Sequence, residues 1–344
     1  MLDTALQLHN PAVWLPLVFA LVMGLAMLAY VILDGYDLGV GVLLAQADDG
    51  QQKDTMIASI GPFWDANETW LVLGVGVLLV AFPAAHGVIL GALYLPVALM
   101  LMALTLRGVA FEFRVKAAAA LRPWWDRAFV FGSVLAAWSQ GFMLGLLITG
   151  FKDDAGSYAF ATLIGFCLLA AYRLLGAGWL ILKTEGPLQL KAVRWAQQSL
   201  WFTAIGVLAI SIATPWVSTR IFDKWFSLPN VFMLLPIPAM TLALFAIIAR
   251  SLQRLPHRLT ENNQYGAAMP FAGTVGVFLL SFYGLAYSLF PWLVIDRLTV
   301  WQAASSVEAL QVIFYGVVVV LPAIIGYTVF SYRVFWGKAT ALKY

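Results

Sequence analysis

Long apolar stretches separated by short polar ones dominate the chain. A helix needs about 20 residues to cross the hydrocarbon core of a bilayer, and nine stretches of roughly that length are free or nearly free of Asp, Glu, Lys and Arg. They are residues 12–33, 69–83, 87–106, 128–150, 158–182, 199–217, 229–249, 270–290 and 309–332. The pattern predicts an all-α, polytopic integral membrane protein of about nine transmembrane helices.

The region between Glu68 and Arg107 carries no charged residue and is too long for one span. Because the segment 82–87 reads Phe-Pro-Ala-Ala-His-Gly, it predicts a tight turn between two helices. The helix before this turn is expected to begin near Pro62. No polar stretch is long enough for a soluble domain, so residues 1–344 are expected to form a single transmembrane domain.

Basic residues are distributed unevenly between the predicted loops. With the N-terminus outside and nine spans, fifteen Lys and Arg residues fall on the inner side and four on the outer side. Cytoplasmic loops are enriched in Lys and Arg, so the pattern predicts an N-out, C-in orientation. The run 4–33 has no basic residue before it and exceeds a signal-peptide core, so it is expected to remain as the first span.

Composition narrows the functional classes. Hydrophobic residues make up 62% of the chain and charged residues 11%, whereas a soluble fold would need many more charges on its surface. A net charge of +3 without a basic run argues against nucleic-acid binding. The single cysteine, Cys167, excludes an internal disulfide or a Cys-ligated cluster. Since His9, His86 and His257 lie outside or at the edge of the spans, we expect no haem held by two mid-membrane histidines and no metal site in this chain.

The first polar motif, Leu-Asp-Gly-Tyr-Asp-Leu-Gly at 33–39, ends the first predicted span. Asp34 and Asp37 are three residues apart and would share a helical face. Apolar residues follow, so both carboxylates are expected at membrane depth, where they are costly and usually functional. A helix-terminal or loop pair bonded to backbone amides is the alternative.

The second motif, Gly-Pro-Phe-Trp-Asp-Ala-Asn-Glu-Thr-Trp at 61–70, places Asp65 and Glu68 on one helical face. Acids in a first turn complement the positive helix N-terminus, and this capping role would explain Glu68. It explains less well why Trp64 and other polar residues gather beside these acids.

The third motif, Leu-Arg-Gly-Val-Ala-Phe-Glu-Phe-Arg at 106–114, places Arg107 on the same membrane side as both acidic motifs. We expect Arg107 to lie near one of those acids, in a group that relays protons from the inner side. An arginine reaching toward the lipid interface is the alternative, and it applies more readily to Arg114. Arg173 lies within the span 158–182, and an anionic lipid headgroup, a backbone carbonyl or a partner-subunit acid would serve as its partner.

Together, segments 33–41, 59–71 and 106–114 resemble subunit II of the cytochrome bd-type ubiquinol oxidases, in order and in spacing. The motif resemblance covers the first third of the chain, and the rest is similar in topology and length. The branch often called cyanide-insensitive is the more similar one. Ala66 stands where many members have glycine.

This resemblance implies a haem-free subunit of a terminal quinol:oxygen oxidoreductase in the bacterial cytoplasmic (inner) membrane. A haem-bearing subunit I would carry two haems b, one haem d and the quinol-oxidising loop. The complex would oxidise quinol, reduce dioxygen to water and take protons from the inner side. The resemblance also allows for a small single-span subunit and for a structural quinone or membrane lipid.

The resemblance gives Asp65 a place in a proton channel, with Asp34 and Asp37 as further members, and makes Trp64 the border of an oxygen channel. The positions of Glu68 and Arg107 in the motifs place Glu68 in the same proton path and make Arg107 the charge partner of its acids. No catalytic residue is expected in this chain. A secondary transporter or ion-coupled permease also suits nine spans with buried carboxylates, and a purely structural assembly subunit is a third reading.

Overall fold

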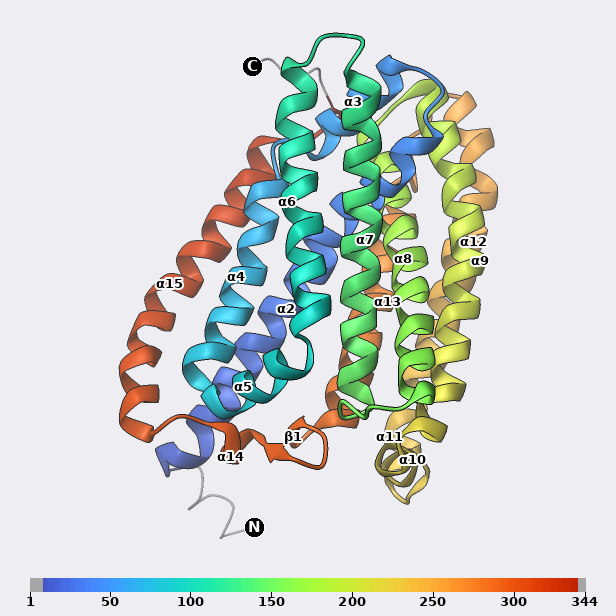
Figure 1. Cartoon of the computed structure of the whole chain (residues 1–344). Helices are drawn as coiled ribbons and strands as arrows, with labels where there is room; N and C mark the ends of the chain where they lie inside the picture. The colour runs from blue at the N-terminus through green and yellow to red at the C-terminus, as the bar shows by residue number, and fades with distance from the viewer. Residues whose placement is uncertain (1–8, 340–344) are drawn as a thin grey trace. The chain divides into compact units, whose positions relative to one another are not determined.

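The structure is a computed structural model that describes residues 9–339, and these are almost entirely helical (Figure 1). In chain order the elements are α2 (Pro11–Leu43), η1 (Leu44–Gln46), α3 (Gly50–Ile60), α4 (Trp64–Ala81), α5 (Pro83–Ala92), α6 (Tyr94–Lys116), α7 (Arg122–Ile148), α8 (Ala155–Lys183), α9 (Gly186–Val217), α10 (Thr219–Phe226), α11 (Asn230–Leu234), α12 (Pro236–Thr260), α13 (Met269–Leu289), β1 (Trp292–Val294), β2 (Leu298–Thr299), α14 (Val300–Ala303) and α15 (Val307–Val334). Within this part of the chain, nine helical segments are long and apolar enough to cross a membrane. The predicted all-α fold with nine spans is confirmed.

The described residues group into two compact units, and neither is continuous in sequence. One comprises residues 9–33, Pro62–Leu93 and Leu289–Trp336; the other comprises Asp34–Gly61, Tyr94–Ser288 and residues 337–339. The long helix α2 contributes to both, because the boundary falls between Leu33 and Asp34.

The first unit joins the start of α2 to α4, α5, α14, α15 and the antiparallel hairpin β1–β2, which pairs Trp292 with Thr299. Tyr30 and Trp70 are buried together where α2 meets α4. In the same unit, the Phe63 ring stacks on Tyr332 of α15, with ring centroids 4.6 Å apart. These contacts hold the start of α4 against the end of α15.

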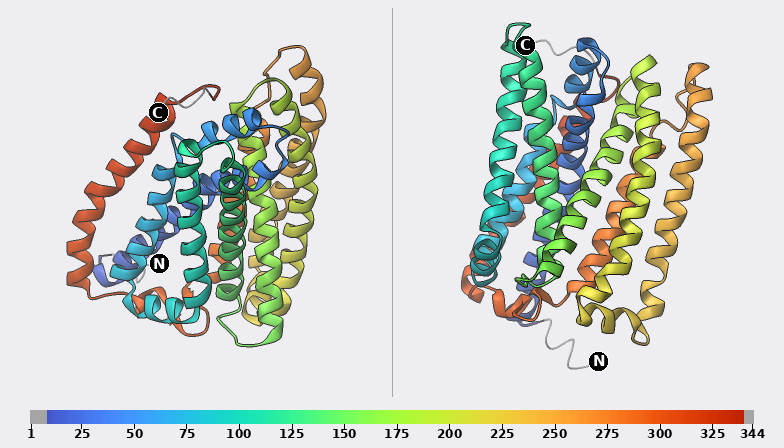
Figure 2. Two further views of the ribbon diagram at one scale, coloured as in Figure 1. Left: turned by 45° about the horizontal axis from the view of Figure 1, so that its top comes forward. Right: turned by 45° about the vertical axis from the view of Figure 1, so that its right-hand side comes forward.

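In the second unit, α6, α7, α8 and α9 follow one another as antiparallel neighbours, and the right-hand view of Figure 2 shows α8 beside α9. The end of α2 packs on α8 through glycines. A Cβ on Gly39 would lie 1.9 Å from the Tyr172 carbonyl oxygen, and one on Gly176 would lie 2.4 Å from the Gly39 carbonyl carbon. Small residues allow two backbones to approach this closely in membrane helices.

The boundaries differ from the predicted spans at three places. The third span is α6, Tyr94–Lys116, and not residues 87–106, because Pro83 starts a separate short helix, α5, that ends at Ala92. Residues Gly50–Ile60, expected in a polar connection, form α3, whose N-terminus is capped by Asp49 accepting from the Gln52 amide at 2.8 Å. The helix expected to begin near Pro62 begins at Trp64.

Candidate functional site

A buried ion pair joins α2 to α6 in the second unit. Arg107 Nη1 donates to Asp34 Oδ1 at 2.7 Å, and each side chain is 1% exposed. The other carboxylate oxygen, Asp34 Oδ2, is buried and has no hydrogen-bond partner among the described residues. Because a charge in a low-dielectric interior is costly unless it is paired, the arginine compensates the carboxylate at this depth.

This acid lies inside a continuous helix, because α2 extends ten residues past Leu33 to Leu43. Asp37 follows one turn later, and it is fully buried. The alternative of a loop or helix-terminal acid pair is therefore wrong. Arg107 likewise lies within α6 and not at its end, since α6 runs on to Lys116.

Aromatic side chains from α8 pack on the part of α2 that carries Asp34. Tyr172 packs so closely on Gly35 that a Cβ there would lie 2.7 Å from its ring, and its hydroxyl donates to Gln140 Oε1 at 2.6 Å. Tyr36 stacks on Trp179, with centroids 4.1 Å apart. Tyr172, with Gln140 as its hydrogen-bond partner, is a polar neighbour of the first motif that sequence reasoning missed, because nothing in the sequence links α7 and α8 to that motif.

The second motif forms the first turns of α4 in the first unit. Trp64 is half-buried, Asp65 is exposed and Glu68 is partly buried. Asn67 is fully buried, and its amide donates to the Leu33 carbonyl oxygen at 3.3 Å while its Oδ1 accepts from the Tyr332 hydroxyl at 3.0 Å. Asn67 therefore ties α4 to both α2 and α15.

The structure places the predicted site residues in two groups. Asp34, Asp37 and Arg107 belong to the second unit, and Asp34 contacts the arginine directly, as predicted for one of the acids. Asp65 and Glu68 belong to the first unit, together with Trp64. Their participation in one path with the buried pair stays a prediction.

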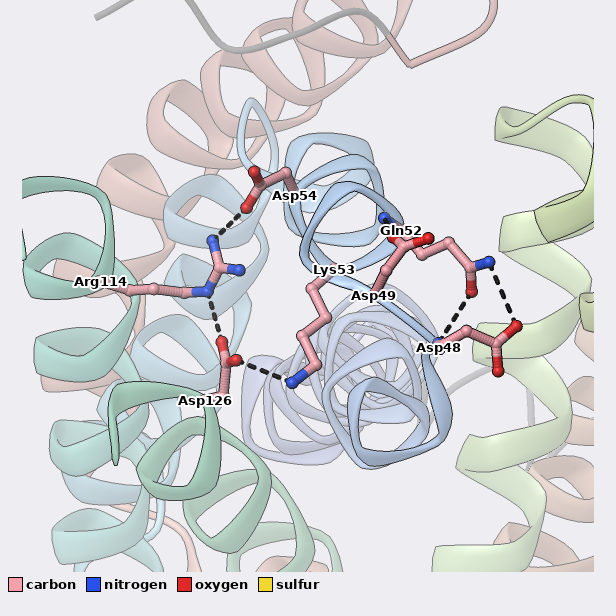
Figure 3. A network of polar contacts seen from close by, with 7 residues as sticks. All are labelled: Asp48, Asp49, Gln52, Lys53, Asp54, Arg114 and Asp126. Atoms are coloured by element: carbon pink, nitrogen blue, oxygen red, sulfur yellow. Dashed lines mark hydrogen bonds and ion pairs between the residues drawn. The ribbon is translucent and has the colours of Figure 1, made fainter. Parts of the chain in front are cut away.

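A further network of ion pairs connects α3, α6 and α7 (Figure 3). Arg114 Nε donates to Asp126 at 2.5 Å and Nη1 to Asp54 at 2.6 Å, and Lys53 donates to Asp126 at 2.9 Å. The side chain of Arg114 is 5% exposed, so it is a buried structural residue and does not extend to the lipid interface.

Within residues 9–339, no three His, Cys, Asp or Glu side chains are grouped so that they could hold a metal ion.

Comparisons with known proteins agree on one family. The family model described as cytochrome bd terminal oxidase subunit II matches residues 15–335. The chain is 29% identical to cytochrome bd ubiquinol oxidase subunit 2 of Bacillus subtilis, with 96% of both chains covered. It is 26% identical to cytochrome bd-I ubiquinol oxidase subunit 2 of Escherichia coli, covering 93% of this chain and 94% of the relative. The fold also matches a chain of the bd oxidase structure from Geobacillus thermodenitrificans, with a TM-score of 0.74, 18% identity, and 94% and 98% of the two chains covered.

Proposed function

The chain belongs to the cytochrome bd terminal oxidase subunit II family, and from this premise we propose that it supports assembly of the oxidase and supplies a proton path for dioxygen reduction. The relatives named above are subunits of ubiquinol oxidases, so the chain acts as part of a quinol oxidase complex in a bacterial membrane. A subunit II implies a partner, subunit I, and a cytochrome bd complex implies haem.

In this proposal the two haems b and the haem d are bound by subunit I. The histidines of the present chain support that division. Among the nine spanning helices of the described part, one histidine occurs, His257, and its side chain is 80% exposed in the last turn of α12. Two histidines on facing helices, the usual way to hold a b-type haem in a bundle, are not found there.

The buried Asp34–Arg107 pair is the main support for the proposed proton path. Ionisable groups inside a membrane protein are expensive and mark ion pathways and proton relays. Arg107 pairs with one oxygen of Asp34, and Asp34 Oδ2 is the buried oxygen that would accept a proton in this path. Asp37, buried one turn further along α2, offers the next acceptor.

Asp65 is proposed as the entry of this path. It is exposed in the first turn of α4, at the end of that helix which the distribution of Lys and Arg predicts to be cytoplasmic in an N-out, C-in chain. An exposed carboxylate exchanges protons readily with water, whereas the buried acids do not. Glu68, partly buried one turn later, would receive the proton, and Trp64 would border the route of oxygen.

The test is Asp65→Asn in the assembled, purified complex. Because Asp65 is exposed, its replacement costs little stability, so its role in proton transfer can be measured apart from folding. We expect oxygen consumption with quinol to fall about tenfold or more, with haem content and the haem d absorption band unchanged. Glu308→Gln is the matched control, an exposed acid in the first turn of α15, and should leave turnover unchanged.

Two outcomes separate this proposal from its alternatives. An acid in the first turn of α4 also suits a purely structural subunit, since it complements the helix N-terminus. Full turnover by the assembled Asp65→Asn complex would favour that structural role. A purified chain that transports a solute and brings no haem d band with it would favour a permease.

A further inference from the structure

Arg173 is a charge inside a spanning helix that the chain itself does not neutralise. It lies on α8, is half-buried, and donates through Nη2 to Gln46 Oε1 at 3.2 Å and to Gln198 Oε1 at 3.3 Å. Both partners are neutral amides. Arg173 makes no ion pair with a described acid, and its buried Nε has no hydrogen-bond partner there. A cation at this depth calls for an anion from outside the chain.

More positive charge lies on α9 beside it. Residues 191, 194 and 198 are three and four apart and so lie on one helix face, which places Lys191 and Arg194 on the face that carries Gln198. Asp48 is the acid that meets them: it pairs with Lys191, and this hydrogen bond, with the nearby Arg194, lowers the pKa of the Asp48 carboxyl. Arg173, Lys191 and Arg194 together carry two more positive charges than Asp48 neutralises.

The same face of α9 becomes apolar toward the membrane interior. Trp201, Ile205 and Leu208 continue the three-and-four spacing and are 71%, 61% and 61% exposed. On α8, Phe166 lies two turns before Arg173 and is 59% exposed. The two helices are packed side by side, since a Cβ on Gly206 of α9 would lie 2.9 Å from the sulfur of Cys167 on α8.

We propose that Arg173, Lys191 and Arg194 bind the phosphate of an anionic phospholipid whose acyl chains lie along the apolar face of α8 and α9. Basic pockets between membrane helices at the cytoplasmic side bind anionic headgroups. A free phosphate would use the charges and leave the apolar face unused. An acid from a partner protein would satisfy Arg173 alone and would not require the two further cations beside it.

The test measures lipid binding to the purified complex by native mass spectrometry in detergent, with dioleoylphosphatidylglycerol as the probe. Dioleoylphosphatidylcholine and inorganic phosphate are the comparison ligands. We expect the apparent affinity for phosphatidylglycerol to fall about fivefold in Arg173→Gln, which corresponds to about 1 kcal/mol. Arg173→Lys should retain most of it, because a lysine still binds phosphate as a point charge.

Two more variants make the result decisive. Arg194→Gln removes an exposed cation of the same site, so it should weaken binding even if Arg173→Gln fails to assemble. Arg250→Gln, an exposed arginine ten residues before the end of α12, should change nothing. Equal binding by wild type and both site variants would overturn the proposal. So would equal binding of phosphatidylcholine, full competition by inorganic phosphate, or no phosphatidylglycerol bound by wild type.

Discussion

Breaking the ion pair between Asp34 and Arg107 should destabilise the protein strongly, and the size of the effect follows from its burial. Each side chain is 1% exposed and the paired atoms are 2.7 Å apart. With charge centres about 4 Å apart and an effective dielectric constant of about 20, the attraction is about 4 kcal/mol. Removing either charge takes its 2.7 Å ion-pair partner from a buried charge, which typically costs about 3–5 kcal/mol.

The perturbations are Asp34→Asn, Arg107→Gln and the double variant, each measured by thermal or denaturant unfolding of the purified complex. We expect each single change to lower the free energy of unfolding by about 3–5 kcal/mol. The double variant should lose at least about 2 kcal/mol less than the sum, because the two residues are in contact. Glu261→Gln is the control, since that acid is 60% exposed beside His257, and should stay within about 0.5 kcal/mol of wild type.

Additive losses in the double variant would contradict a direct interaction, because additivity means that the two side chains do not affect each other. Single losses below about 1 kcal/mol, the range of exposed pairs, would refute it as well, since they would show that water reaches the pair.

Two further predictions concern helix packing and helix capping. Gly176→Ala should lower the melting temperature of the complex and cost about 1–3 kcal/mol or more, because the added Cβ would lie 2.4 Å from the Gly39 backbone. Gly91→Ala is the control and should leave the melting temperature unchanged, because a Cβ there would have nothing within 4 Å. Equal melting temperatures for the two variants would contradict this prediction. Asp154 caps α8 by accepting from the Ser157 amide and hydroxyl at 2.8 and 2.9 Å, and the amide bond in particular lowers the pKa of its carboxyl below the ordinary 3.8. Its contribution is therefore complete above pH 3.8 and is lost as the pH falls through the lowered pKa, so the difference in melting temperature between wild type and Asp154→Ala should shrink in acid; a difference that does not change with pH would refute this assignment.

The nine spans could be predicted because a bilayer imposes a simple rule on sequence: about 20 residues without charge. The boundary at α5 and α6 could not, because residues 83–116 are apolar for most of their length and hydropathy does not show that the chain turns at Leu93. The residues around Pro83 predict one turn, but no local residue pattern predicts the second turn between α5 and α6.

The burial of individual acids could not be predicted from the sequence. Asp34 and Asp65 both stand beside aromatic and glycine-rich segments, yet one is 1% exposed and the other lies on the surface. The difference arises from α6, which brings Arg107 to Asp34 across 73 positions of sequence. Contacts such as that of Asn67 with Tyr332, 265 positions apart, have no local signal that one sequence could reveal.

The most direct test of the proposed proton path is time-resolved proton uptake during a single turnover. The fully reduced, purified complex would be mixed with oxygen in weakly buffered solution containing a pH indicator dye, while haem oxidation is recorded in parallel. We expect Asp65→Asn to slow proton uptake about tenfold or more, whereas Glu308→Gln should not slow it. Proton uptake at the wild-type rate by a fully assembled Asp65→Asn complex would contradict it.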